Sequence, residues 1–189
     1  MENKKLLEEI RSYWNNRADG YSRVNQEELH SEQKEKWKEV LLEQLPKKEK
    51  DQVQILDIGT GPGFFAILLA EEGYQVTAVD YTEQMLQEAK SNAADLADQI
   101  SFKRMDAQNL EFPKETFDYI VTRNVTWNLE HPKRAYREWQ RVLKPGGKIL
   151  NFDANWYAYL YDDKLKLGYE QDRQRAKEEQ VEDYYEGTD

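Results

Sequence analysis

The stretch from Ile55 to Ala66 constrains the fold more than any other part of the chain. Apolar residues lead into an acid, Asp57, and are followed by three glycines at alternate positions and by a second apolar run from Phe64 to Ala70. This order predicts a buried strand, a tight turn and a helix that begins at the turn. Glycine tolerates positive φ and lets a ligand approach the backbone, while the helix start adds free N–H groups. We therefore expect a ligand cradle at the carboxyl end of a strand, where open α/β sheets bind ligands.

The spacing of the glycines indicates which ligand the cradle takes. A dinucleotide-binding G-x-G-x-x-G pattern would require glycine where Phe64 stands. The chain instead reads D-x-G-x-G-x-G from Asp57 to Gly63. A second acid, Asp80, closes the next apolar run at the distance where a strand-end carboxylate binds ribose hydroxyls. The pair of acids favours a nucleotide-like ligand over the alternative, a plain glycine turn before a helix.

The glycine motif resembles the first motif of the class I S-adenosylmethionine-dependent methyltransferases. Three further segments are similar to the ubiquinone/menaquinone-biosynthesis-like members of that family: residues 13–21, 104–110 and 141–147. The resemblance covers about residues 11–153. It implies S-adenosylmethionine as cofactor and an enzyme that transfers a methyl group to a small-molecule acceptor. The alternatives are an inactive cofactor-binding module or fragment of a methyltransferase, and a nucleotide oxidoreductase, which Phe64 disfavours.

The resemblance also implies the residues that bind the cofactor. Asp80 would hold the ribose hydroxyls, and Tyr81 and Met85 would flank the adenine. Asp106 would accept a hydrogen bond from the adenine amino group, and Tyr21 would close over the sulfonium. Without the resemblance, Met85 reads as a core residue and Asp106 as an ordinary turn acid. The expected cofactor-binding residues are Tyr21, Asp57, Gly59, Thr60, Gly61, Asp80, Tyr81, Met85, Asp106, Ala107 and Asn124.

Aromatic residues near the strand ends are the expected acceptor wall, with core packing as the alternative. These residues are Trp127, Trp156 and Tyr157. We assign no catalytic base, because no Ser-His-Asp or paired-carboxylate pattern is present, and His131 precedes a proline at a helix start where capping is its expected role. The segment 123–127 also lacks the Asn-Pro-Pro-aromatic signature of adenine and glutamine methylators, which argues against amide and exocyclic-amine acceptors.

Apolar runs alternate with helical patterns along the middle of the chain, which predicts an α/β fold with a parallel sheet. The expected strands are Val53–Ile58, Gln75–Asp80, Ile100–Arg104, Phe117–Thr122 and Lys148–Asp153. The resemblance implies a Rossmann-like, doubly wound sheet in the order 3-2-1-4-5. We divide the chain into a helical cap (1–50), a cofactor-binding core (51–154) and a polar C-terminal helix or tail (155–189).

The N-terminal region is expected to form two helices that cap the core. Apolar residues recur at helical spacing over residues 3–16, and Asn15-Asn16 and Asp19-Gly20 are expected to end that helix. Asn25, with Glu28 three residues later, is a candidate capping box for the second helix. At the other end of the chain, residues 155–182 are expected to form a single polar helix.

The fifth strand is expected to lie at an edge of the sheet. The family's sheet has two further strands, an antiparallel pair, but no strand-like run follows Asp153. An edge strand exposes unpaired N–H and C=O groups that invite pairing with another chain. We therefore predict self-association through this edge, as a homodimer, over the alternative of a mobile C-terminal segment.

Composition excludes several other functions. The net charge of −10 argues against a nucleic acid or an anionic membrane surface as partner. The chain has no cysteine and two histidines far apart, so we expect no disulfide, no thiol nucleophile and no metal site. No signal-peptide pattern or membrane-length apolar run is present, which predicts a cytoplasmic protein.

Overall fold

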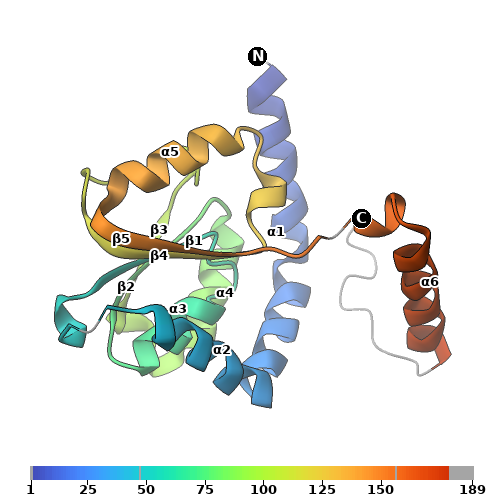
Figure 1. The fold of residues 1–189 in the computed structure, drawn as a ribbon, viewed down its shortest axis with the longest axis horizontal. Helices are drawn as coiled ribbons and strands as arrows, with labels where there is room; N and C mark the ends of the chain where they lie inside the picture. The colour runs from blue at the N-terminus through green and yellow to red at the C-terminus, as the bar shows by residue number, and fades with distance from the viewer. Residues whose placement is uncertain (1, 47, 156, 179–189) are drawn as a thin grey trace.

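The computed structural model describes residues 2–46, 48–155 and 157–178 (Figure 1). Within these residues a five-stranded parallel sheet runs in the order β3-β2-β1-β4-β5, which confirms the predicted Rossmann-like topology. The strands are β1 (Gln54–Ile58), β2 (Gln75–Asp80), β3 (Ile100–Arg104), β4 (Phe117–Arg123) and β5 (Leu143–Phe152).

Helices cover both faces of the sheet, with α5 on one face and α2 and α3 on the other (Figure 1). The helices are α1 (Glu2–Leu29), α2 (Glu32–Gln44), α3 (Phe64–Glu71), α4 (Glu83–Ala93), α5 (Pro132–Val142) and α6 (Asp163–Glu178). Four short 3₁₀ turns join them: η1 (Lys50–Gln52), η2 (Ala94–Gln99), η3 (Thr126–Asn128) and η4 (Ala158–Leu160). None of the described helices is both long enough and apolar enough to cross a membrane.

The central strands are buried on both faces, as their apolar runs predict for a parallel sheet. In β4, Tyr119 and Val121 pack into a cluster with α3, whereas Ile120 packs into a second cluster with Trp139 of α5. This burial fixes the register of β1, β2 and β4, because a slip by one residue would exchange the two faces. The carboxyl ends of the strands are thereby held at one side of the sheet, next to α1 (Figure 1).

The N-terminal region is one continuous helix, so the predicted break between Asn15 and Gly20 was wrong. A glycine inside a helix costs only about 0.5–1 kcal/mol, and packing offsets it here. Ala18 and Gly20 are buried, and Gln26 donates a hydrogen bond to Asn92 of α4 at 2.7 Å. The predicted capping box at Asn25 was wrong for the same reason: the second helix begins later, and Ser31 is its N-cap.

The C-terminal third of the chain also differs from the prediction. The fifth strand begins at Leu143 instead of Lys148, because the Pro-Gly-Gly segment stays beside β4 as an irregularity between two paired regions. The segment after the strand is not one helix from residue 155: a 3₁₀ turn comes first, and α6 begins after Asp162, whose side chain accepts from two backbone N–H groups. The last residues of the predicted helix, 179–182, lie outside the described residues.

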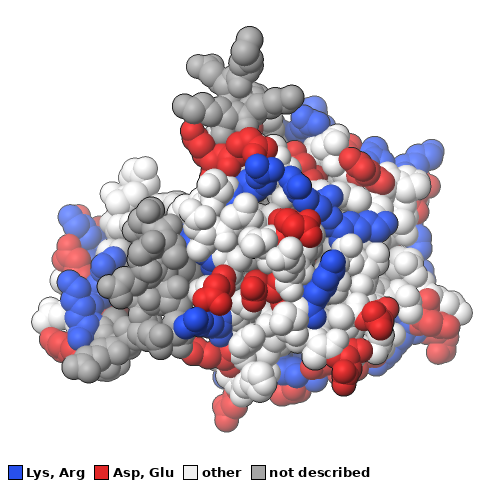
Figure 2. Space-filling model, turned by 180° about the vertical axis from the view of Figure 1, so that it is seen from behind, with Lys and Arg blue, Asp and Glu red and all other residues white. Residues whose placement is uncertain are grey.

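The surface carries both signs of charge. On the face opposite to that of Figure 1, Figure 2 shows lysine and arginine side chains interspersed with aspartate and glutamate. At the opposite end of the sheet from α1, the buried Asp118 accepts from Lys48 and Lys144 at 2.9 and 2.6 Å. These ion pairs hold the pKa of Asp118 at about 2 although burial opposes the shift. We therefore assign Asp118 a role in stability, because it joins Lys48 and Lys144 at the end of the sheet away from the cavity.

Candidate cofactor site

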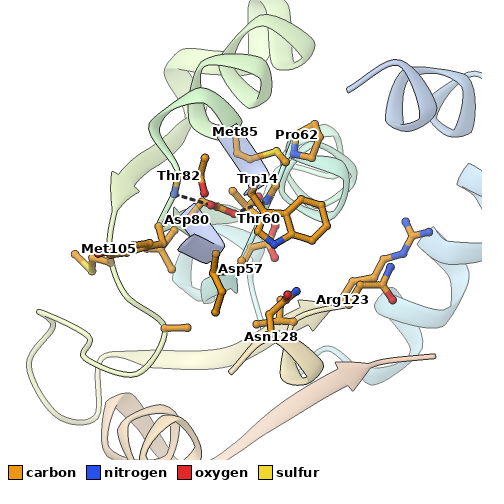
Figure 3. A pocket seen from close by; sticks show the side chains of 18 of the residues that line it. Trp14, Asp57, Thr60, Pro62, Asp80, Thr82, Met85, Met105, Arg123 and Asn128 are labelled. Carbon is orange, nitrogen blue, oxygen red and sulfur yellow. Dashed lines mark hydrogen bonds between the residues drawn. The ribbon is translucent and has the colours of Figure 1, made fainter. Parts of the chain in front are cut away.

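A cavity opens at the carboxyl ends of the strands, between the sheet and α1. It encloses about 1050 Å³ when its open mouth is counted. Figure 3 shows side chains from α1, from the turn after β1 and from the ends of β2 and β4 converging on it. All eleven residues that the resemblance nominated for the cofactor line this cavity. Their roles there remain predictions, but the fold brings them together.

The turn between β1 and α3 forms the floor of the cavity. One oxygen of the buried Asp57 accepts from the Thr60 hydroxyl at 2.7 Å and from the Ala66 N–H at 3.1 Å. Asp57 therefore ties the turn to the first turn of α3. Gly59 and Gly61 have φ of +64° and +53°, a region that other residues rarely adopt. At these two positions the turn consequently contributes backbone and no side chain of its own to the cavity.

Asp80 projects from the end of β2 towards the glycine turn (Figure 3). Its two oxygens accept from the backbone N–H groups of Gly61 and Thr82 at 2.9 and 2.8 Å. Each carboxylate oxygen can accept more than one hydrogen bond, so Asp80 can also accept from ligand hydroxyls in the cavity that it lines. Burial raises the pKa of Asp80, and it raises the pKa of Asp57 to about 7 despite the hydrogen bonds that both accept.

Tyr81, Met85 and Asp106, the residues expected to meet the adenine, all line the cavity. The Tyr81 hydroxyl donates to Glu8 of α1 at 3.2 Å, which fixes its ring at the cavity edge. Met85 is 2% exposed, so it belongs to the core as well as to the cavity wall. Asp106 accepts from the backbone N–H of Gln108 at 2.8 Å and is therefore also a turn acid. A core position for Met85 and a turn role for Asp106 are both compatible with contact to a ligand.

The opposite end of the cavity lies beyond β4. Arg123 donates two 2.9 Å hydrogen bonds to Glu28 of α1, and its guanidinium lies 4.9 Å from the ring centre of Phe64. Asn124 follows with φ of +58°, a conformation that asparagine tolerates better than most residues. The ion pair between Arg123 and Glu28 attaches α1 to the end of β4 at this side of the cavity.

The expected acceptor wall does not line the cavity in the structure. Trp127 is 37% exposed and packs against Trp14 and Tyr157 with ring centres 6.1 and 6.2 Å apart. Trp14 does line the cavity, so Trp127 and Tyr157 lie one layer further out, at its rim. Trp156 lies outside the described residues.

Several cavity residues were not predicted from the sequence. They are Trp14, Asn25, Gln108, Arg123 and Asn128. Trp14, Tyr21 and Asn25 are spaced by seven and four residues, which places them on one face of a continuous helix. The signal was present, but the predicted break in the helix concealed it. Gln108 had no local signal, since it acts by accepting from the His131 N–H at 2.6 Å across the fold.

Comparison with known proteins identifies the family. A family model described as a methyltransferase domain matches residues 56–151, about half of the chain. The chain belongs to the S-adenosylmethionine-dependent methyltransferases. The match spans β1 to β5 and so includes the glycine turn, Asp80 and Asp106.

Individual relatives of this methyltransferase agree with that assignment. It is 31% identical over 109 residues to the ubiquinone biosynthesis O-methyltransferase of Coxiella burnetii, which covers 57% of this chain and 47% of that protein. The PH0226 protein of Pyrococcus horikoshii superposes with a TM-score of 0.60 and 30% identity, over 72% of this chain and 65% of that one. The phosphoethanolamine N-methyltransferase 2 of Haemonchus contortus, solved with S-adenosyl-L-methionine, gives a TM-score of 0.55 and 30% identity, over 61% and 27%.

The cavity of this methyltransferase fits the family's cofactor. Its floor is bare backbone at two glycines, and its wall offers acceptor positions on Asp80 at the end of β2. Among the described residues, no group of three histidine or acidic side chains could hold a metal ion. The methyltransferase spans about half the length of the curated relative from Coxiella.

Proposed function

We propose that this methyltransferase transfers the methyl group of S-adenosylmethionine to a small-molecule acceptor. The observation that carries the proposal is Asp80, a carboxylate at the end of β2 that is bonded to the glycine turn and lines the cavity. A family match alone would leave the function at the level of the fold. The convergence of eleven nominated residues on one cavity supports a cofactor site in this chain.

The cofactor supplies an electrophilic methyl group on a sulfonium, and the residues of the chain supply binding, alignment and exclusion of water. Tyr21 lies directly over the turn: a Cβ built on Gly61 would be 3.4 Å from its ring. Leu7, Ile10 and Trp14 continue this apolar cover along α1. We assign residues 1–50 the role of a cap that closes the site over the reacting atoms.

The acceptor is proposed to enter beside α1 and the turn after β4. Trp127 contacts Trp14 of the cavity wall, and Tyr157 contacts Trp127 in turn, so these two exposed rings form an aromatic rim at this place. Aromatic side chains offer a large apolar surface to a ring-containing ligand. The name of the Coxiella relative, a ubiquinone biosynthesis O-methyltransferase, agrees with an acceptor of this class.

Calorimetry on the Asp80→Ala variant tests the cofactor site. Loss of hydrogen bonds to a charged group should weaken binding of S-adenosylhomocysteine by roughly 1.5–3 kcal/mol. Asp95→Ala provides a matched control, because Asp95 is an exposed acid outside the cavity. Binding of S-adenosylhomocysteine by Asp80→Ala as tightly as by the parent, or preference of the parent for NAD, would refute the proposal.

Turnover distinguishes an enzyme from a binding module. Transfer of a labelled methyl group from S-adenosylmethionine should be measured against a panel of phenolic, quinol and amine acceptors. Trp127→Ala should lower turnover and leave S-adenosylhomocysteine affinity unchanged, because Trp127 does not line the cofactor cavity. Cofactor binding with no transfer to any member of the panel would favour the inactive-module alternative.

A further inference from the structure

Asn25 is a buried polar side chain whose oxygen has no partner within the described structure. It is 7% exposed, and its Oδ1 accepts no hydrogen bond from any described residue. The side chain lines the cofactor cavity. A buried amide oxygen without a donor is costly, and most such groups in folded proteins are satisfied. A group inside the cavity is therefore a candidate for the missing donor.

Three polar neighbours of Asn25 on α1 are hydrogen-bonded within the protein. Ser22 and Gln26 both bond to Asn92 of α4. Glu28 accepts from Arg123 through both of its oxygens. Asn15 is another residue of α1 whose buried Oδ1 has no described partner, but it does not line the cavity. Asn25 alone of these residues combines an unpaired buried oxygen with a position in the cavity wall.

The position of Asn25 along α1 indicates which part of the cofactor it meets. It lies one helical turn beyond Tyr21, which covers Gly61, and one turn before Glu28, which binds Arg123 at the end of β4. The ribose of the cofactor carries adenine on one side and the amino-acid chain on the other. With the ribose at Asp80 and the adenine towards Asp106, the amino-acid chain runs over the glycine turn towards β4. Arg123 and Glu28 neutralise each other there, which leaves Asn25 as an open polar group.

We infer that the side-chain amide of Asn25 binds the amino-acid end of S-adenosylmethionine. This inference rests on the proposed cofactor site. The amino-acid end carries an ammonium donor, which suits the unpaired Oδ1, and a carboxylate acceptor, which suits the amide NH₂. Because Asn25 belongs to α1, the same bond attaches the covering helix to the ligand beneath it.

Two ligands that differ only at the amino-acid end test the inference. S-adenosylhomocysteine carries this end, whereas 5′-methylthioadenosine keeps the adenine, ribose and sulfur but lacks it. Asn25→Leu should weaken S-adenosylhomocysteine binding in calorimetry by roughly tenfold and leave the methylthioadenosine Kd within about twofold. The ligand-free variant should unfold at the same or a higher temperature than the parent, because the unpaired amide is gone.

Asn15→Leu is the matched control, because it removes an unpaired buried amide from the same helix but away from the cavity. It should leave both dissociation constants unchanged. Asn25→Ala, a smaller replacement, should give the same selective loss and guards against misfolding of the leucine variant. Equal weakening of both ligands, or no weakening of either, would overturn the inference and leave the proposed function standing. A parent protein that binds neither ligand would refute the proposed function as well.

Discussion

At the scale of single residues, Gly59 shows why the turn after β1 has the composition it has. Its φ is +64°, and a Cβ added there would lie 2.4 Å from Cγ2 of Val125. Gly59→Ala should therefore combine backbone strain with overpacking against the turn after β4, at a cost of about 1–3 kcal/mol for the overpacking alone. Urea denaturation of the variant measures the loss.

Gly73→Ala separates strain from the steric clash. Gly73 follows α3 with φ of +84°, but a Cβ there would meet only Lys50, at 3.9 Å. The Gly73→Ala variant should therefore be destabilised by backbone strain alone, by about 1–2 kcal/mol. The double variant Gly59→Ala/Val125→Ala should recover part of the loss of Gly59→Ala. Equal losses for Gly59→Ala and Gly73→Ala would show that Val125 does not limit the turn.

The carboxyl group of Asp57 predicts a pH dependence of stability. Burial raises its pKa from an ordinary 3.8 to about 7 in the folded protein. The folded chain therefore holds this proton more tightly than the unfolded chain. As the pH rises from about 4 to about 7, the contribution of Asp57 to the free energy of unfolding consequently decreases. Asp57→Asn, which keeps one acceptor oxygen, should gain unfolding free energy relative to the parent across that range.

The contrasting residue for this experiment is Asp118, whose pKa is lowered to about 2. Its contribution is present above pH 4 and is lost only as the pH falls towards 2. Asp118→Asn should thus show no change in relative stability between pH 4 and 7. A flat difference for Asp57→Asn over the same range would mean that Asp57 titrates normally in the folded chain.

The site residues that could be predicted from the sequence belong to short motifs or follow predicted strands. The glycine turn and Asp57 lie within seven residues of one another, Asp80 closes an apolar run that predicts a strand, and Asp106 comes two residues after the next predicted strand. Gln108 could not be found in this way, because it acts through His131, more than twenty residues away in the chain, and the spacing that points to Asn25 was concealed by the predicted break in the helix. The acceptor role of Trp127 stays a prediction: the structure places it against Trp14 of the cavity wall, and sequence alone does not give the direction of loop side chains.

At the scale of elements, α1 shows tertiary contacts overriding local signals. Asn15-Asn16 and Asp19-Gly20 are weak helix formers, yet the helix passes through them because its inner face is bonded to α4 and β4. The strands were predictable within one residue at each end for β1 to β4. In β1 and β4, burial on both faces requires continuous apolar runs. The edge strand β5 lacks that requirement, and its start was misplaced by five residues.

Glu28→Gln tests how firmly α1 is anchored. Glu28 accepts from Arg123 twice and from Trp37 at 3.0 Å, so loss of its charge should cost roughly 1.5–3 kcal/mol. Asp19→Asn is the control, because Asp19 and Arg23 form an exposed pair on the same helix that should contribute at most about 1 kcal/mol. Comparable effects of the two variants on unfolding, and unchanged amide exchange in α1, would contradict the assigned anchor.

At the scale of the whole molecule, β5 is an edge strand within the described residues, and α6 stands away from the sheet beyond its end (Figure 1). The η4–α6 segment exposes several large apolar side chains: Leu160, Tyr161, Leu165 and Leu167. The prediction of self-association through the edge therefore stands. Light scattering should show a dimer that dissociates on dilution.

Asn151→Lys should shift this equilibrium towards the monomer, because a lysine on an exposed edge strand opposes pairing. Asn151 lies on β5 and is exposed, whereas Asn155 is exposed but lies beyond the strand. Asn155→Lys adds the same charge and should leave the equilibrium unchanged. A strict monomer for the parent at high protein concentration would refute association through the edge.

The unequal fastening of α1 has a kinetic consequence. Near its C-terminal end the helix is held by the two-bond ion pair with Arg123, whereas nearer its N-terminal end Glu8 accepts an exposed hydrogen bond from the Tyr81 hydroxyl. Local opening begins where contacts are fewest. Exchange of a spent cofactor for a fresh one is therefore expected to proceed by detachment of the N-terminal turns while the other end stays in place. The dwell time of the ligand would then depend on a short segment of α1 and not on unfolding of the domain.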